Sequence, residues 1–242
     1  VQQAPGFTYE STWVIAKYLD HDTTYPNMLL DYNCGTRTYD TQTGYNHKGT
    51  DISLWPYPWN QFHIQQTEIV AGAPGIIILK QDGNFDMNCA FNSNPWNAVY
   101  VQHGDGSIAM YGHMKNGSLT TKLVGDSVIL GEVLGKVGSS GSSTGPHLHF
   151  EVMDSSYNLI DPYVGSCNSL NSSSWWANQL PYLNSNINAL MSHFSPPVID
   201  SCPYVALIND TNFFNSPDTV FLSCYLRDQQ SSSTIYCNLY DP

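Results

Sequence analysis

Four histidines and one aspartate in this chain have types and spacings that suit metal-assisted hydrolysis. They occur in HKGTD from His47 to Asp51, in YGHM around His113, and in GPHLHFEV around His147 and His149. A catalytic zinc site takes three protein ligands from imidazole and carboxylate groups and keeps its fourth position for water. His47, Asp51 and His149 can supply these three groups. The set therefore predicts a zinc peptidase site.

The two histidines of HLH are expected to point the same way. The segment HLHFEV is short, aromatic and β-branched, which is typical of a strand, and residues i and i+2 of a strand project from one face of a sheet. One imidazole can then hold a metal while the other faces the substrate. Glu151 follows on the same face, where it could orient an imidazole or serve as an ordinary structural carboxylate.

In their order along the chain, HKGTD, YGHM and HLH resemble the motifs of the lysostaphin and LytM type of zinc endopeptidases, peptidase family M23. The flanking run GSSGSSTGPHLHFEV is also similar to the family pattern, and the resemblance extends over about residues 46–162, roughly half of the chain. It implies one zinc ion per chain and an intact site. The implied zinc ligands are His47, Asp51 and His149, and the implied catalytic pair is His113 and His147.

The resemblance also implies a mechanism and a substrate class. Zinc lowers the pKa of a bound water toward about 7 and polarises the scissile carbonyl. The chain has no HExxH glutamate to take the water proton, so His113 and His147 are left to act as base and as proton donor, in either order. Tyr39 or Tyr45 could add a phenol to the transition state. The expected reaction is hydrolysis of peptide cross-links in bacterial peptidoglycan, at glycine-containing or stem-peptide bonds.

Strand-like runs predict a mainly β fold, with an antiparallel sheet and the site in a groove on one of its faces. The clearest runs are residues 75–79, 98–103, 127–138 and 147–152. We expect four parts: an N-terminal extension packed on the peptidase domain (1–40), the M23-like zinc peptidase domain (41–165), a linker or strap (166–197), and a small disulfide-containing β unit (198–242). Three strands are expected in the last part, at residues 204–208, 219–228 and 233–242. Such a unit is either an appendage or the front of a truncated β-sandwich.

The six cysteines indicate an oxidising compartment. Their number is even and their spacing is unlike that of a metal site, which favours disulfides in a secreted, extracellular bacterial protein. The first residue is Val1 rather than methionine, as expected where a secretion signal has been removed. We expect Cys34 to pair with Cys89, and the other four to pair beyond the peptidase domain. These four are Cys167, Cys202, Cys224 and Cys237.

Charge and hydropathy exclude several partner classes. The formal net charge is −12 with only 8 basic residues, which argues against nucleic acid and against simple electrostatic adhesion to an anionic wall. No apolar run reaches the length of about 18 residues that a membrane span needs. We expect a monomer whose partner is its peptide substrate.

Two other functions and one structural alternative remain open at this stage. The chain could digest extracellular glycine-rich proteins such as elastin-like substrates, or it could be a non-catalytic module that binds peptidoglycan or a partner hydrolase. The aromatic and proline residues from Trp55 to Trp59 could form one wall of a substrate groove or a hydrophobic plug under a loop.

Overall fold

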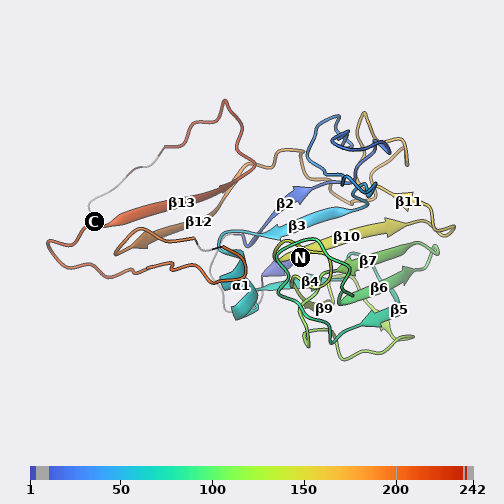
Figure 1. The fold of residues 1–242 in the computed structure, drawn as a ribbon, viewed down its shortest axis with the longest axis horizontal. Helices are drawn as coiled ribbons and strands as arrows, with labels where there is room; N and C mark the ends of the chain where they lie inside the picture. Colours follow the sequence, from blue (N-terminus) through green and yellow to red (C-terminus); the bar gives the residue numbers. More distant parts are fainter. Residues whose placement is uncertain (4–10, 200, 237, 239–242) are drawn as a thin grey trace.

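The protein is mainly β, with short antiparallel strands and, within the described residues, a single short helix (Figure 1). The structure is a computed structural model that describes residues 1–3, 11–199, 201–236 and 238. The mainly β class expected from the sequence is confirmed. In chain order the elements are β1 (Gln2–Gln3), β2 (Trp13–Lys17), β3 (Thr50–Leu54), α1 (Pro58–Ile64), β4 (Thr67–Val70), β5 (Gly75–Gln81), β6 (Ala98–His103), β7 (Ile108–Gly112), β8 (Ser127–Val128), β9 (Val133–Lys136), β10 (His147–Met153), β11 (Leu159–Ile160), β12 (Asn186–His193) and β13 (Phe221–Arg227).

An eight-stranded antiparallel sheet holds the centre of the molecule. Seven of its strands follow the order β2-β3-β10-β7-β6-β5-β8, and β11 pairs with the far end of β10. The β-branched runs that predicted strands at 75–79, 98–103 and 147–152 form β5, β6 and β10. The run 127–138 is divided into two short strands, β8 and β9, which belong to different sheets.

Strand β10 separates the hydrophobic core from the opposite face of the sheet. Leu148, Phe150 and Val152 are buried in one core cluster with Ile69 of β4 and Leu134 of β9. The three-stranded sheet β1-β4-β9 therefore covers one face of the large sheet. Because side chains alternate along a strand, the intervening residues of β10 project to the other face. Those residues are His147, His149 and Glu151.

The N-terminal residues are joined to the two sheets by strand pairing. Strand β1 pairs with β4, and β2 forms the edge of the large sheet beside β3. A second core cluster lies on this side, where the rings of Tyr18, Tyr32 and Tyr163 meet with centroid distances of 4.9 to 5.1 Å. This aromatic cluster joins the N-terminal region to the segment that follows β11.

The disulfides differ from the expected pairing. Cys34 is bonded to Cys167, and Cys89 is bonded to Cys202, so the prediction of a Cys34 to Cys89 bond is wrong. The tyrosine cluster brings the first pair together, since the Cys167 amide donates to the carbonyl of Tyr32 over 2.9 Å. Cys224 is exposed and forms no disulfide with any described residue, and Cys237 lies outside the described residues.

Strands β12 and β13 form a separate two-stranded sheet, which lies to the left of the large sheet in Figure 1 with α1 between them. The expected strand at 219–228 corresponds to β13, but that at 204–208 is wrong, because this segment makes only the isolated bridge of Val198 to Leu207. Residues 233–236 are not in a strand, and the rest of the third expected strand falls mostly outside the described residues. The partner of β13 comes instead from the expected linker. No helix in the described part of the chain has the length and apolar character needed to cross a membrane.

Candidate metal centre and active site

The pairing of β10 with its two neighbours brings distant parts of the sequence to one point. Asp51 of β3 lies directly opposite His149 of β10, and Gly112 of β7 lies opposite the same histidine on the other side. His113 follows Gly112 and has a φ of 58°, a left-handed conformation that is uncommon outside glycine and that turns its side chain away from the strand direction. The strand register therefore places residues from three motifs around His149.

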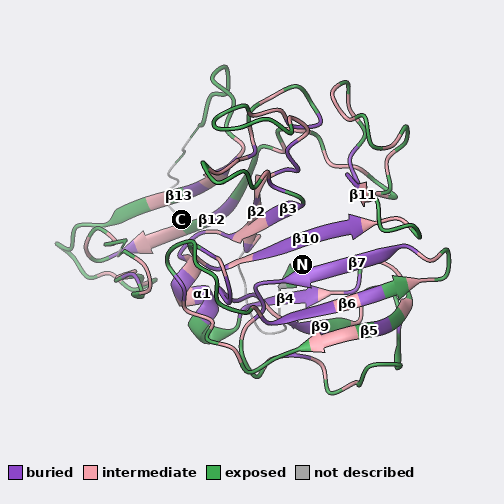
Figure 2. Ribbon diagram, turned by 45° about the vertical axis from the view of Figure 1, so that its right-hand side comes forward, coloured by how far each residue is buried: buried purple, intermediate pink, exposed green. Residues whose placement is uncertain are grey.

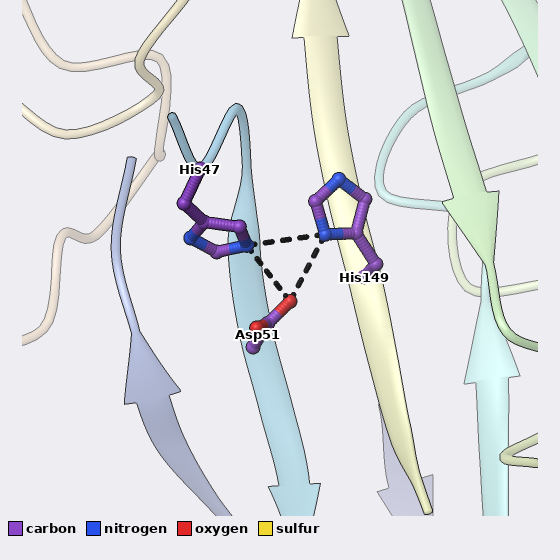
Figure 3. A group of neighbouring side chains, drawn as sticks. All are labelled: His47, Asp51 and His149. Carbon is purple, nitrogen blue, oxygen red and sulfur yellow. Dashed lines mark hydrogen bonds and ion pairs between the residues drawn. The ribbon is translucent and has the colours of Figure 1, made fainter. Parts of the chain in front are cut away.

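His47, Asp51 and His149 converge on one buried point (Figure 3). The Oδ1 atom of Asp51 lies 3.0 Å from Nε2 of His47 and 3.0 Å from Nδ1 of His149, and these two nitrogens are 3.2 Å apart. All three residues are buried. Gly49 permits this approach, because a Cβ there would lie 2.5 Å from the carbonyl oxygen of Phe150 and 2.9 Å from the His149 ring.

The three donor atoms fit a zinc ion by chemistry and by spacing. Two imidazoles and one carboxylate are a usual ligand set for catalytic zinc, and ligands at about 2.0 to 2.2 Å from a tetrahedral ion lie roughly 3.3 Å from one another. Hydrogen bonds to the remaining ring nitrogens fix the orientation of the imidazoles. Nδ1 of His47 donates to the carbonyl of Tyr18 over 2.7 Å, which leaves its Nε2 lone pair for a metal. Nε2 of His149 lies 3.4 Å from Oε2 of Glu151, so this carboxylate can accept a proton from the nitrogen that does not face the cluster.

Contacts within this cluster shift the pKa values of Asp51 and His149 in opposite directions. Burial alone would raise the pKa of Asp51, but electrostatic interaction with the His47 and His147 imidazoles and hydrogen bonds from His149 and His47 hold that pKa well below its usual range. Burial alone would lower the pKa of His149, but Asp51 and Glu151 outweigh it and raise that pKa to about 9. A divalent cation would replace the proton on His149 as the partner of the carboxylate.

His113 and His147 lie beside the cluster and beside each other. Their ring centroids are 4.5 Å apart. Nδ1 of His113 donates to the carbonyl of Ser140 over 2.6 Å, and Nδ1 of His147 donates to that of Gly145 over 2.8 Å. Burial is the main reason that the pKa of each imidazole is lowered. Both rings therefore carry a proton on Nδ1 and present a basic Nε2, and Nε2 of His147 is 3.5 Å from Oδ1 of Asp51.

Comparison with known proteins identifies the family of this domain. Residues 45–162 match the sequence model of Peptidase family M23. These residues belong to peptidase family M23. This agrees with the resemblance seen in the motifs, and the M23 domain is that of a metallopeptidase.

The chain aligns with only a small part of each individual relative. Over 88 residues the chain is 39% identical to the DD-carboxypeptidase/endopeptidase Mpg of Neisseria meningitidis serogroup B, which is 36% of this chain and 17% of that protein. Over 64 residues it is 34% identical to the peptidoglycan DD-endopeptidase ShyC of Vibrio cholerae, which is 26% of this chain and 14% of that protein. The chain thus spans about a sixth of the length of these relatives. Among solved structures, the catalytic domain of lysostaphin from Staphylococcus simulans is 28% identical with a TM-score of 0.38, over 52% of this chain and 83% of that chain.

The M23 site opens into two hollows. The larger has a volume of about 670 Å³ and is lined by His113, His149 and Glu151, among others. The smaller has a volume of about 550 Å³ and is lined by Asp51 and His147, among others. His113 thus lines the larger hollow and His147 the smaller one, although the two rings are in contact, with centroids 4.5 Å apart. Three residues line both hollows: Tyr39, Phe91 and Ser142.

The wall formed by residues 85–96 was not anticipated from the sequence. Phe91 and Trp96 of this segment line the larger hollow, and the Trp96 ring meets His113 edge-on with centroids 5.2 Å apart. The segment is rich in asparagine and aromatic residues and precedes β6, but it carries no motif. Its composition alone could have marked it as a loop with aromatic residues available for binding.

Part of the run from Trp55 to Trp59 lines a hollow and part of it packs in the hydrophobic clusters. Leu54, Pro58 and Trp59 line the smaller hollow, while the Trp59 side chain is also buried in the main core. Tyr57 and Trp55 contact the other side, where they pack against β12 and β13. The phenol candidates Tyr39 and Tyr45 both line the larger hollow, and the Tyr39 ring stacks on His47 with centroids 4.5 Å apart.

Proposed function

We propose that the protein is a zinc metalloendopeptidase that hydrolyses peptide bonds in the cross-links of bacterial peptidoglycan, outside the cytoplasm. The convergence of His47, Asp51 and His149 on one buried point, with two further imidazoles beside them, is the observation that carries this proposal. The names of the relatives Mpg and ShyC support the substrate class, since both describe endopeptidases and one names peptidoglycan.

The zinc ligands in this proposal are His47, Asp51 and His149. A bound zinc ion supplies Lewis acidity, which polarises a carbonyl group and makes a water molecule more acidic. The chain itself holds the donor atoms in place: the Tyr18 carbonyl orients His47, and Glu151 orients His149.

His113 and His147 move the protons. Each donates its Nδ1 proton to a backbone carbonyl, so the lone pair of each Nε2 can accept a proton from water. The two rings lie next to each other, with centroids 4.5 Å apart, so both border the same stretch of a peptide bound beside the metal-binding cluster. One imidazole takes a proton from the attacking water at Nε2. The other has to enter the reaction protonated at Nε2 to give a proton to the leaving amine, and the pair is restored when the first ring loses its proton to solvent and the second regains one.

The proposed location outside the cytoplasm rests on the disulfides. Cys34 to Cys167 and Cys89 to Cys202 are both formed in the structure, and such bonds persist in oxidising compartments. The acidic chain gains little from general attraction to an anionic wall. Recognition of the substrate then depends on the two hollows beside the site.

The test uses purified bacterial sacculi as substrate and His113→Ala and His147→Ala as variants. The wild-type protein should release soluble fragments with new amino termini that mass spectrometry can assign to individual peptide bonds. Each variant should keep about one zinc per chain and slow hydrolysis by about 10² to 10⁴, the usual contribution of a positioned acid or base. Zinc content measured by atomic absorption serves as the control for site integrity.

Other outcomes of this test point to the other functions. Hydrolysis of insoluble elastin with intact sacculi would replace the proposal by a protease of glycine-rich proteins. A zinc-loaded wild-type protein that binds sacculi without cutting them would be a binding module. Normal turnover by either histidine variant would refute the catalytic roles given to His113 and His147.

A further inference from the structure

Seven of the eight lysine and arginine side chains in this protein hold their positive charge against a partner. Each of the seven forms an ion pair, donates to a backbone carbonyl or lies over an aromatic ring; they are Lys17, Arg37, Lys80, Lys115, Lys122, Lys136 and Arg227. The ammonium group of Lys48 has no ion pair, hydrogen bond or ring contact with any described residue. The charge of Lys48 is therefore available to a ligand.

Lys48 lies next to the metal-binding cluster. It follows His47 in the sequence, and the Cα atoms of consecutive residues are about 3.8 Å apart. The His47 side chain is buried, whereas Lys48 is exposed and lines the larger hollow together with His113 and His149. An anion that binds the Lys48 ammonium group thus shares this hollow with the imidazole of His113.

The larger hollow carries little other charge. Among its described lining residues, Lys48 is the only lysine or arginine and Glu151 is the only aspartate or glutamate. The Glu151 side chain is buried with its Oε2 atom 3.4 Å from Nε2 of His149, and no ion pair joins it to Lys48 in the described structure. The larger hollow therefore presents one unpaired positive charge.

The smaller hollow has the opposite character. Its charged lining residues, among those described, are Lys17, Asp40 and Asp51. The Lys17 ammonium group donates to the carbonyl of Thr38 over 3.1 Å, and Asp51 belongs to the metal-binding cluster. The carboxylate of Asp40 remains, and it repels anions. A negatively charged part of a substrate is thus favoured in the larger hollow and disfavoured in the smaller one.

We propose that Lys48 binds a free carboxylate of the stem peptide, and that the protein therefore prefers cross-links whose stem carboxylates are not amidated. This inference rests on the proposed function, since it assigns the substrate class of the same site. An ammonium group has three donors, and its hydrogen bonds to a carboxylate are strengthened by charge. The chain as a whole has a formal net charge of −12, so this attraction is local and also orients the substrate along the groove.

The test uses synthetic cross-linked stem peptides. The parent peptide keeps every stem carboxylate free, and each analogue has one carboxylate replaced by a carboxamide, which is neutral and of nearly the same size. For the wild-type protein, kcat/KM should be about fivefold lower with at least one analogue than with the parent, the upper end for an exposed ion pair. The change should lie in KM, because Lys48 contacts the substrate and the transition state alike.

Variants of Lys48 test whether this residue recognises the carboxylate. Lys48→Met keeps most of the aliphatic chain and removes the charge. It should lower kcat/KM with the parent peptide by about fivefold and abolish the difference between the parent and the analogue. Lys48→Arg keeps the charge and should keep the preference. Both variants should keep the zinc content of the wild type, because neither alters a ligand.

A second lysine and a change of salt concentration provide the controls. Lys122→Met removes the same charge from the chain, but Lys122 pairs with Glu132 and is not among the residues that line the two hollows. It should keep the wild-type preference. Raising the ionic strength from about 0.01 M to about 1 M shortens the Debye length from about 30 Å to about 3 Å. The preference of the wild type should shrink over this range.

The possible failures are distinguishable. If the wild-type protein cuts the parent and every analogue at equal rates, the role of Lys48 is refuted and the proposed function stands. A preference that Lys48→Met retains would mean that another group recognises the carboxylate, which also refutes this role. If zinc-loaded wild-type protein cuts neither the peptides nor the sacculi, the proposed function fails and the inference about Lys48 fails with it.

Discussion

Strand β10 is supported very differently from the antiparallel pair of strands β12 and β13, which we call the hairpin although residues 194–220 separate them. In β10, the five residues from Leu148 to Val152 are all buried. In β13, Phe221, Leu222 and Cys224 are exposed, and Leu190 of β12 has 70% of its surface accessible. Figure 2 shows the contrast, with the central strands mostly coloured as buried and the hairpin mostly as intermediate or exposed.

The difference follows from what covers each sheet. β10 has strand partners on both sides and a packed core behind it, whereas β12 and β13 have only each other as partners. A two-stranded hairpin is marginally stable in water by itself. The hairpin therefore depends on particular contacts to the M23 domain, among them Tyr57 with Tyr225 and the indole of Trp55 with the carbonyl of Leu226. The side chains of the candidate site thus lie on a strand that is held by two neighbours and a packed core, whereas β12 and β13 are held by a small number of side-chain contacts.

The largest expected effect comes from replacing His149, and the buried His193 of β12 provides the matched control. His149→Ala should reduce bound zinc from about one ion per chain to near zero and reduce hydrolysis to background, because Asp51 and His47 are left as an incomplete ligand set. His193 of β12 is equally buried but only donates from Nδ1 to the carbonyl of Ile208 over 2.7 Å. His193→Ala should cost about 1 to 3 kcal/mol of stability and keep zinc and activity. Metal analysis and hydrolysis rates of the two purified variants make the comparison.

Equal behaviour of these two variants would break the contrast between the regions. Zinc retained by His149→Ala would mean that the metal is held elsewhere, and zinc lost by His193→Ala would mean that the hairpin supports the metal site directly.

The same contrast explains what could be predicted from the sequence. The strands at 75–79, 98–103 and 147–152 were predictable because their β-branched and aromatic runs are local signals. The motif HLH predicted that His147 and His149 share a face, and both lie beside Asp51 in the structure. For such residues the local pattern and the tertiary fold agree.

Other features depend on contacts between distant residues and have no local signal. Cys34 and Cys167 are 133 residues apart and meet because Tyr32 and Tyr163 pack together. The sequence of β12, NINALMSH, has little strand character and falls in the expected linker or strap, and the segment forms a strand through its pairing with β13. Phe91 reaches the groove only because the segment 85–96 is tied to residues 139–143. In each case the partner, and not the pattern, determines the structure.

The second expected effect concerns the covalent bond between the two regions. Cys89 and Cys202 are 113 residues apart in the sequence, and in the chain-entropy model a bond that closes a loop of this size contributes roughly 4 to 5 kcal/mol. Cys89→Ser together with Cys202→Ser should lower the Tm and speed hydrogen exchange in β12 and β13 more than in β10. Differential scanning calorimetry and deuterium uptake by peptide are the measurements.

The matched control is the other disulfide. Cys34→Ser together with Cys167→Ser removes a bond that closes an even longer loop. This bond lies at the tyrosine cluster and not in the segment between β12 and β13. This double variant should lower the Tm without speeding hydrogen exchange in β12 and β13 more than in β10. Selective exchange in both double variants would show that the hairpin responds to global stability alone.

The smallest expected effect tests a single polar contact between the regions. Asn60 of α1 donates from Nδ2 to the carbonyl of Ala206 over 3.1 Å and accepts from the Ala206 amide over 2.8 Å, so its side chain pairs with the backbone as a neighbouring strand would. Asn60→Ala should cost about 1 to 3 kcal/mol, because each bond contributes about 0.5 to 1.5 kcal/mol. Asn60→Asp keeps the acceptor but sets a carboxylate oxygen against the Ala206 carbonyl, so it should not recover the stability that Asn60→Ala loses in urea unfolding. Ile64→Ala, at a half-exposed position of the same helix, should change stability little.

If Asn60→Ala speeds hydrogen exchange only in the segment around Ala206 and leaves kcat/KM on peptidoglycan peptides unchanged, the hairpin is a structural attachment. A parallel loss of kcat/KM would instead mean that the hairpin supports the groove through Pro58 and Trp59. These two residues of the same helix line the smaller hollow.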